Sequence, residues 1–142
     1  MTITTDRAAA AASVSAPVSR AALTLLRQAA ECVADGHRAP EPLVRYPAAY
    51  LAALRAGAAV LAARAVPEVP PQRRARPRSV WQLLAQVAPE LGEWAAFFAS
   101  CSDTRAAAEA GIARLVGRRE ADDLLRQAEQ FVGICRELLV DR

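Results

Sequence analysis

The apolar residues of this chain recur at steps of three and four along most of its length after residue 18. That spacing places them on one face of an α-helix, whereas a half-buried strand needs strict alternation. Residues 118–140 give the clearest stripe, formed by Ala121, Leu124, Ala128, Phe131, Cys135 and Leu138. Val, Ile, Thr and Tyr form no alternating runs. The pattern therefore predicts an all-α fold, a bundle of helices.

Alanine supplies most of the apolar content, since 54% of the 142 residues are hydrophobic but only 5% are aromatic. Alanine is the best helix former and lets helices pack closely. A chain of this length can bury a core without disulfides or metals. We expect one domain over residues 19–142, preceded by a disordered tail of Ala, Ser and Thr over residues 1–18.

Start and stop signals divide the first half of the chain into two helices. Ser19 is a candidate N-cap for the first, which should end near Asp35-Gly36. Its apolar face should consist of Leu23, Leu26, Ala30 and Val33. The second is long, at about residues 43–65, and Pro47 either marks its start or bends its entry. Gly57, in its alanine-rich middle, should allow a neighbouring helix to approach closely.

The second half contains shorter helices and one long one. Ser79 is the expected N-cap of a third helix, and Pro89 should break it and open a fourth. Asp103 is expected to cap a short helix that ends at Gly111. The last helix should cover about residues 118–140.

A basic, proline-rich loop is predicted between the second and third helices, over residues 66–78. It contains four prolines and the arginines Arg73, Arg74, Arg76 and Arg78. Such arginines next to Trp81 suit phosphates of single-stranded nucleic acid. The alternative is an exposed linker, because Trp81 lies at helical spacing with Leu84 and so suits the core.

The cysteines and the hydropathy pattern indicate a cytoplasmic protein without cofactors. Cys32, Cys101 and Cys135 are odd in number and far apart, which argues against disulfides and a zinc site. We expect buried thiols in a reducing compartment. No run approaches the roughly 20 apolar residues of a membrane span. Asp6 and Arg7 precede an alanine run, whereas a signal peptide has a basic start and a stronger apolar core.

The adjacent acids Asp122 and Asp123 begin the last helix. Neighbouring helical residues point about 100° apart, so one should face solvent while the other flanks the apolar stripe. Arg55 of the second helix is the expected partner of that inner carboxylate. The two interpretations are an ion pair between helices and a functional polar pocket; the acids form no metal site.

Three segments resemble the HEPN superfamily, with the middle one typical of small actinobacterial HEPN proteins. They are Tyr46-Pro-Ala-Ala-Tyr-Leu-Ala-Ala-Leu-Arg-Ala-Gly-Ala-Ala-Val60, then Arg78-Ser-Val-Trp-Gln-Leu-Leu84 with Ala88-Pro-Glu-Leu-Gly-Glu-Trp-Ala-Ala-Phe-Phe98, and Arg119-Glu-Ala-Asp-Asp-Leu-Leu-Arg-Gln-Ala-Glu-Gln-Phe131. The resemblance covers about residues 20–140. It implies an antiparallel bundle of four to five helices, often dimeric. Adjacent Phe97 and Phe98 cannot both face inward equally, so one of them suits a face between subunits.

Many HEPN proteins are RNases that rely on an Arg followed, after four to six residues, by a His at the dimer interface. The chain has one histidine, His37, and Arg20 and Arg27 lie too far upstream of it. No other hydrolase, P-loop or metalloprotease motif occurs. The expected guanidinium and imidazole pair for acid–base work and phosphate stabilisation is therefore missing.

The sequence thus favours a non-catalytic HEPN-like binding module, a homodimer that binds RNA, a nucleotide or a protein. The alternatives are a toxin-like RNase with a non-standard Arg/Asp site and a structural adaptor in a repair or division complex. The candidate binding residues are Arg55, Arg73, Arg74, Arg76, Arg78, Asp122 and Asp123.

Overall fold

The computed structural model describes residues 19–64 and 77–140. Its helices are α2 (Arg20–Arg38), α3 (Pro42–Ala63), α5 (Pro77–Val87), α6 (Gly92–Ser100), α7 (Ser102–Glu109) and α8 (Arg118–Leu139), with 3₁₀ turns at Pro89–Leu91 and Ala113–Leu115. No strand occurs in these two ranges. The prediction of an all-α bundle is confirmed.

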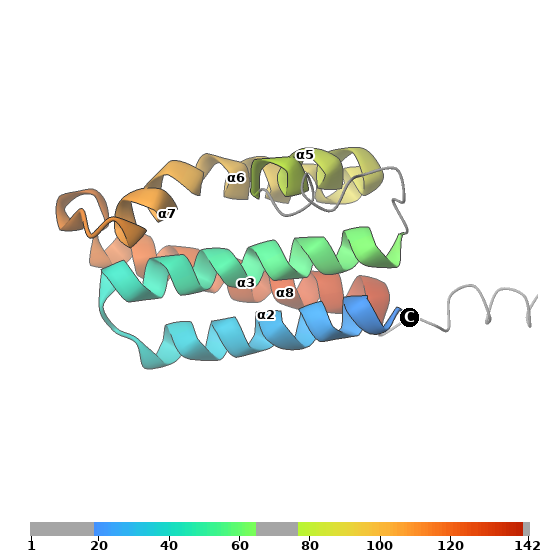
Figure 1. Ribbon diagram of the computed structural model, residues 1–142, viewed down its shortest axis with the longest axis horizontal. Helices are drawn as coiled ribbons and strands as arrows, with labels where there is room; N and C mark the ends of the chain where they lie inside the picture. The colour runs from blue at the N-terminus through green and yellow to red at the C-terminus, as the bar shows by residue number, and fades with distance from the viewer. Residues whose placement is uncertain (1–18, 65–76, 141–142) are drawn as a thin grey trace, which may run out of the picture.

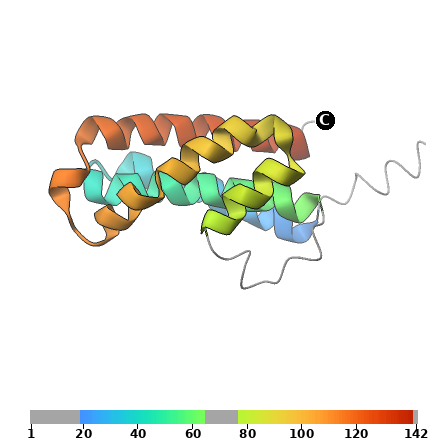
Figure 2. The same cartoon turned by 90° about the horizontal axis from the view of Figure 1, so that it is seen from above.

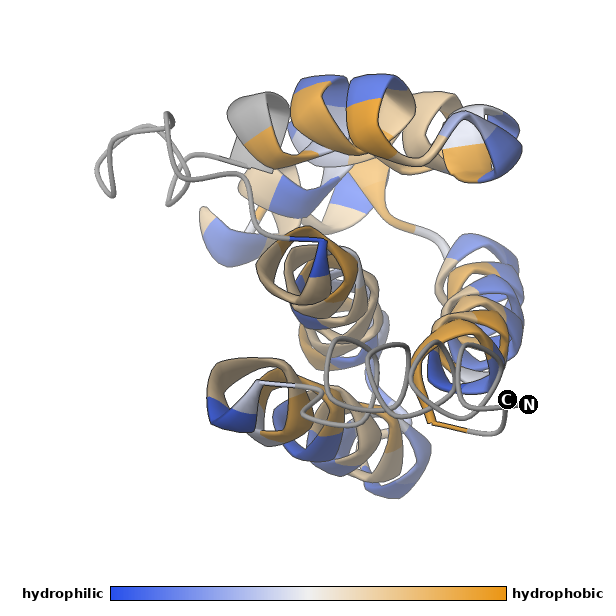
Figure 3. Ribbon diagram, turned by 90° about the vertical axis from the view of Figure 1, so that its right-hand side faces the viewer, coloured by the Kyte–Doolittle hydropathy of each residue, from blue (hydrophilic) through white to orange (hydrophobic). Residues whose placement is uncertain are grey.

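Helix α3 lies at the centre of the bundle. α2 and α8 pack along it on one side, and α5, α6 and α7 form a layer on the other (Figures 1 and 2). In the end-on view, α2, α8 and the α5–α6 layer surround α3 (Figure 3). α2 runs antiparallel to α3, whereas α8 runs in the same direction as α3, so the N-termini of α3 and α8 lie at the same end (Figure 1).

The central position of α3 explains its composition. Its buried residues are Tyr46, Ala49, Tyr50, Ala52, Ala53, Ala56, Gly57, Ala59, Val60 and Leu61. By length and hydropathy this helix is apolar enough to cross a membrane. The expectation that no segment approaches that limit was therefore wrong. Within the bundle, however, 56% of the apolar window is buried, as in the core helix of a globular domain.

Two helical glycines allow close approach between helices. A Cβ on Gly57 would lie 3.2 Å from the Trp81 ring and 3.4 Å from Leu84, which confirms the expected role of Gly57. A Cβ on Gly36 would lie 2.8 Å from Leu125 Cδ1. Gly36 was expected to end its helix, but α2 continues to Arg38 because this glycine serves packing instead. The helix ends before Pro40, which disfavours a helical conformation at Ala39.

The helix starts are only partly as predicted. Ser19 caps α2, its Oγ accepting from the Ala22 N–H at 3.1 Å. Helix α5 already begins at Pro77, a residue suited to a first helical position, so Ser79 lies inside the helix and the predicted loop ends before residue 77. The rest of that loop, and the tail over residues 1–18, lie outside the described residues.

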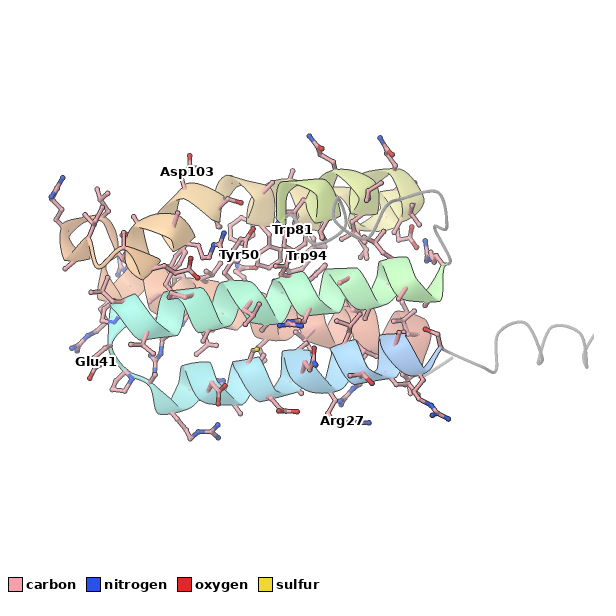
Figure 4. The ribbon with its side chains drawn as sticks, viewed as in Figure 1. Arg27, Glu41, Tyr50, Trp81, Trp94 and Asp103 are labelled. Atoms are coloured by element: carbon pink, nitrogen blue, oxygen red, sulfur yellow. The ribbon has the colours of Figure 1, made fainter. Side chains whose placement is uncertain are left out.

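The connections around α6 and α7 show a second pair of differences. Pro89 opens a 3₁₀ turn, and α6 itself begins at Gly92. Asp103 lies in the first turn of α7, not at its cap, because Cys101 joins α6 almost directly to α7. Asp103 points away from α3 (Figure 4).

Gly111 terminates α7 as predicted. It has a φ of 79°, in the left-handed region that favours glycine. The Ile112 N–H bonds the Ala107 carbonyl at 2.9 Å, and the Gly111 N–H bonds the Ala108 carbonyl at 3.0 Å. This pair of bonds is the Schellman arrangement of a helix C-terminus.

An aromatic cluster fills the space between α3 and the α5–α6 layer (Figure 4). The Trp81 ring stacks on Phe98 with centroids 5.3 Å apart, and Phe98 lies 5.1 Å from Phe131. Trp81 Nε1 donates to the Tyr50 hydroxyl at 2.9 Å, so its buried N–H is satisfied. Phe98 is fully buried whereas its neighbour Phe97 is 40% exposed, as the sequence predicted for one of the two.

We predict that Gly57→Val lowers the free energy of unfolding by about 1–3 kcal/mol, the usual cost of overpacking a core. The added methyl groups would meet the rigid Trp81 ring. The control is Ala58→Val, which adds the same branched residue to the next, half-buried position. Urea denaturation of both variants checks the prediction, and equal stability would contradict it.

Candidate functional site

Three helix ends meet at the guanidinium of Arg45. Arg45 lies in the first turns of α3, and its Nη1 donates to Asp122 Oδ1, in the first turns of α8, at 2.5 Å. Its Nε donates to the Gly36 carbonyl at 2.9 Å, and its Nη2 to the His37 carbonyl at 3.3 Å, both in the last turn of α2. We call this arrangement the Arg45 junction.

The junction satisfies groups that helices leave unpaired. The last carbonyls of a helix have no intrahelical donor, and a cation near them is also favoured by the helix dipole. A carboxylate near the start of α8 is favoured by the opposite end of that helix's dipole. The Arg45 side chain is 17% exposed, so solvent screens its interactions less than those of a surface pair.

The two aspartates divide as predicted, but the expected partner of the inner one was wrong. Asp123 is exposed and pairs with Arg126 on its own helix. Asp122 bonds Arg45, whereas Arg55 donates to Gln28 Oε1 of α2 at 2.9 Å. Arg55 lies ten residues further along α3 than Arg45, about 15 Å along the helix axis, and so at the wrong height for Asp122.

The sequence did not predict a contact for Arg45, because apolar spacing shows which face of a helix is buried and not which helix ends meet. The orientation of the helices was the absent information: α3 and α8 begin at the same end of the bundle (Figure 1). A basic residue in the first turns of α3 can therefore meet an acid in the first turns of α8.

Two further polar contacts join different elements of the bundle. His37 Nε2 lies 2.8 Å from Glu129 Oε1, which connects the last turn of α2 to α8. Both side chains are more than half exposed. At the opposite end of α3, Arg64 Nη2 lies 2.6 Å from Glu90 Oε2, and its Nη1 donates to the Val87 carbonyl at 3.1 Å. The sole histidine of the sequence thus takes part in a contact between helices.

Only three of the candidate binding residues, Arg55, Asp122 and Asp123, have side chains that the structure describes. Arg73, Arg74 and Arg76 lie outside the described residues. Arg78 belongs to α5 by its backbone, and its side chain is likewise outside the description. Arg55 and Asp122 have separate partners, so these two residues do not form a joint pocket.

A groove between α2 and α8 was not predicted. One hollow of about 470 Å³ is lined by Leu23, Leu26, Arg27, Ala30, Arg136 and Val140. An adjoining hollow of about 210 Å³ is lined by Ala30, Val33, Glu129, Val132, Gly133 and Arg136. Because the hollows share Ala30 and Arg136, we treat them as one α2–α8 groove.

The groove exposes residues that the sequence assigned to the core stripe of the first helix. Leu23 is 41% exposed and Ala30 is exposed as well, whereas Leu26 and Val33 are buried. At the far end of α8, Val140 is 48% exposed. α2 and α8 each pack mainly against α3 and contact each other less. The apolar stripe on α2 is wider than the part of it that is buried, and this excess width was the signal for the groove in the sequence.

Burial disfavours the charged forms of Cys135 and Tyr46. Burial raises the pKa of the Cys135 thiol to about 12, and desolvation also raises the pKa of the Tyr46 hydroxyl. Cys101 is buried and Cys32 half-buried. Over the described ranges, no group of three or more His, Cys, Asp or Glu side chains is placed to hold a metal ion.

We predict that Arg45→Met lowers the free energy of unfolding by about 1–3 kcal/mol, because hydrogen bonds to charged groups are lost and Asp122 keeps no partner. A double-mutant cycle with Asp122→Asn should give a coupling energy of about 0.5 kcal/mol or more. The matched cycle of Arg55→Met with Asp122→Asn should be additive. Chemical denaturation measures both cycles, and coupling to Arg55 but not to Arg45 would refute the Arg45 junction.

Comparison with known proteins adds a family to this geometry. A family model of SAV_6107-like HEPN domains matches residues 34–136, from the end of α2 through most of α8. No curated protein and no solved structure matches the chain. The matched region contains the Arg45 junction, the aromatic cluster and the α8 side of the groove. Because this match covers well over half of the sequence, the chain belongs to the HEPN superfamily.

Proposed function

We propose that this HEPN protein acts by binding another protein through the α2–α8 groove, and not by processing RNA. The observation that carries the proposal is the exposed apolar lining of the groove. Leu23 and Val140 stand at one end of it, and both are more than 40% exposed. When a partner covers aliphatic side chains that are this exposed, apolar surface is removed from water, and this contributes favourably to the free energy of binding.

The shape of the groove suits a helical partner. It follows two helices, and its middle is formed by the small residues Ala30 and Gly133. An amphipathic helix laid in such a groove inserts residues at steps of three and four. The apolar lining is flanked by the charged residues Arg27, Arg136 and Glu129. A bound partner would therefore contact charged groups at the rim of the groove and apolar groups at its centre.

The polar side chains near the groove support a binding role over a catalytic one. An RNase of this superfamily would need a guanidinium and an imidazole directed at one phosphate. Here Arg45 is held by Asp122 and two carbonyls, and His37 is paired with Glu129. Both groups link helices of the bundle. Contact of RNA with Arg73, Arg74, Arg76 and Arg78 stays a prediction from the sequence.

The absence of nuclease activity is the first test. The purified full-length protein is incubated with a fluorogenic oligoribonucleotide, with Mg²⁺ and with EDTA. We expect no cleavage above that of a buffer control, because His37 and Asp122 are committed to structural pairs. Cleavage that disappears in His37→Ala or Asp122→Asn, with folding retained, would contradict a binding-only function.

The second test locates the contact surface. A photo-crosslinking amino acid replaces Ala30 in the groove or, as a matched control, Ala99 on the exposed face of α6. The full-length variants are irradiated in cells, and covalent adducts are identified by mass spectrometry. We expect protein adducts from position 30 in excess over position 99. Equal or absent adducts at position 30 would remove the groove as the binding surface.

A further inference from the structure

We propose that the partner bound in the α2–α8 groove presents an acidic amphipathic helix, whose carboxylates pair with Arg27 and Arg136. This inference rests on the proposed function, since it names the chemistry of the partner that the groove binds. It follows from the two arginines that line the larger hollow, from the pairing of the other charged residues nearby and from the length of the groove.

The larger hollow has two cations on opposite walls, Arg27 on α2 and Arg136 on α8. Its other lining residues are all apolar, namely Leu23, Leu26, Ala30 and Val140. Both arginines are exposed, and Arg27 points away from α3 (Figure 4). Two like charges that line one hollow repel each other, so a negative group bound there is favoured.

These two arginines differ from the arginines that link parts of the bundle. Arg45, Arg55 and Arg64 each donate to a side-chain oxygen of another element. By contrast, Arg27 and Arg136 form no ion pair or hydrogen bond with any residue in the ranges that the structure describes. Their guanidinium groups are therefore available to an acid from outside the described bundle.

Two acidic residues close to the groove do not neutralise these arginines. Glu129 lines the smaller hollow, where its Oε1 lies 2.8 Å from His37 Nε2. Glu31 follows Arg27 by four residues, a spacing that permits an ion pair along α2, but the two side chains form none. The larger hollow thus combines two guanidinium groups with an apolar lining. This combination selects a carboxylate that is carried on an apolar surface.

The length of the groove favours a helix over a small carboxylic acid. A small acid would occupy the larger hollow alone, whereas the two hollows are continuous through Ala30 and Arg136. From Leu23 to Val33 the groove follows α2 for about 15 Å, or about three turns of a helix. A partner helix of that length places apolar side chains along the lining and acidic side chains beside them, at the two arginines.

Fluorescence anisotropy of synthetic peptides with the full-length protein tests the proposal. Both probes are amphipathic helices of about 15 residues, with Leu at steps of three and four and with either Glu or Gln beside that face. We expect the Glu peptide to bind about tenfold more tightly, because the Gln peptide lacks the charge-assisted contacts with the two arginines. Binding of the Glu peptide should weaken as the salt concentration rises. Octanoate, a small acid, should not displace it at equal concentration.

Substitutions of the arginines locate the contact. Arg27→Gln and Arg136→Gln should each weaken binding of the Glu peptide by about tenfold and leave binding of the Gln peptide unchanged. Arg119→Gln removes the same charge from an exposed position at the opposite end of α8 and should change neither affinity. The double variant Arg27→Glu with Arg136→Glu should bind a Lys version of the peptide most tightly, because the complementary charges are exchanged. Circular dichroism establishes that the variants remain helical.

Several results would overturn the inference. They are no binding of the Glu peptide, equal affinity for the Glu and Gln peptides, equal effects of Arg27→Gln and Arg119→Gln, and displacement by octanoate at equal concentration. The partner segment that crosslinks to position 30 in cells gives a second measurement, and we expect it to contain more Asp and Glu than Lys and Arg. If that segment is neutral or basic, the proposed function stands and this inference fails. If position 30 gives no adduct, the proposed function fails as well.

Discussion

The bundle depends on how closely its other helices approach α3. Half of the buried residues of α3 are alanines, and Gly57 lies where a Cβ would crowd the Trp81 ring. The large core side chains therefore come mainly from the surrounding helices, with Trp81 from α5, Phe98 from α6 and Phe131 from α8. Because many side chains on α3 are small, α2, α8 and the α5–α6 layer can all pack closely against it. This close packing explains how a chain with few aromatic residues fills its core.

The same constraint produces the groove. α2 and α8 are each drawn against α3, and so they contact each other over a smaller area. Their side-chain links lie at one end, in the Arg45 junction and the pair of His37 with Glu129. These polar contacts fix the register of the helices where backbone carbonyls need donors. Toward the other end the groove remains apolar and open. The groove is therefore a consequence of packing around α3, with polar contacts at its margin.

Helix periodicity was sufficient to predict most of the fold. The stripe from Ala121 to Cys135 is buried as expected, and the segments that resemble HEPN proteins fall within the matched family region. Boundaries were less certain, because Ser79 and Asp103 are good caps in isolation but neighbouring Pro77 and Cys101 decide where the helices begin. The preference of Ser79 and Asp103 for N-cap positions was overridden by the way the helices are connected.

The site was harder to predict than the fold, for physical reasons. Apolar spacing does not reveal which flank of a stripe is covered, so Leu23 and Ala30 were assigned to the core although they border a groove. Likewise, one of the two adjacent aspartates was correctly expected to face another helix, but the partner that Asp122 meets depends on the relative height of α3 and α8. Arg45 and Arg55 look alike in sequence, and only their positions along the helix axis distinguish them.

The most direct test of the groove is NMR of the full-length protein with ¹³C-labelled methyl groups, recorded alone and with the partner captured from position 30. The account predicts that the partner changes the signals of the methyl groups of Leu23, Val33, Val132 and Val140. Changes confined to methyl groups outside the groove would contradict it.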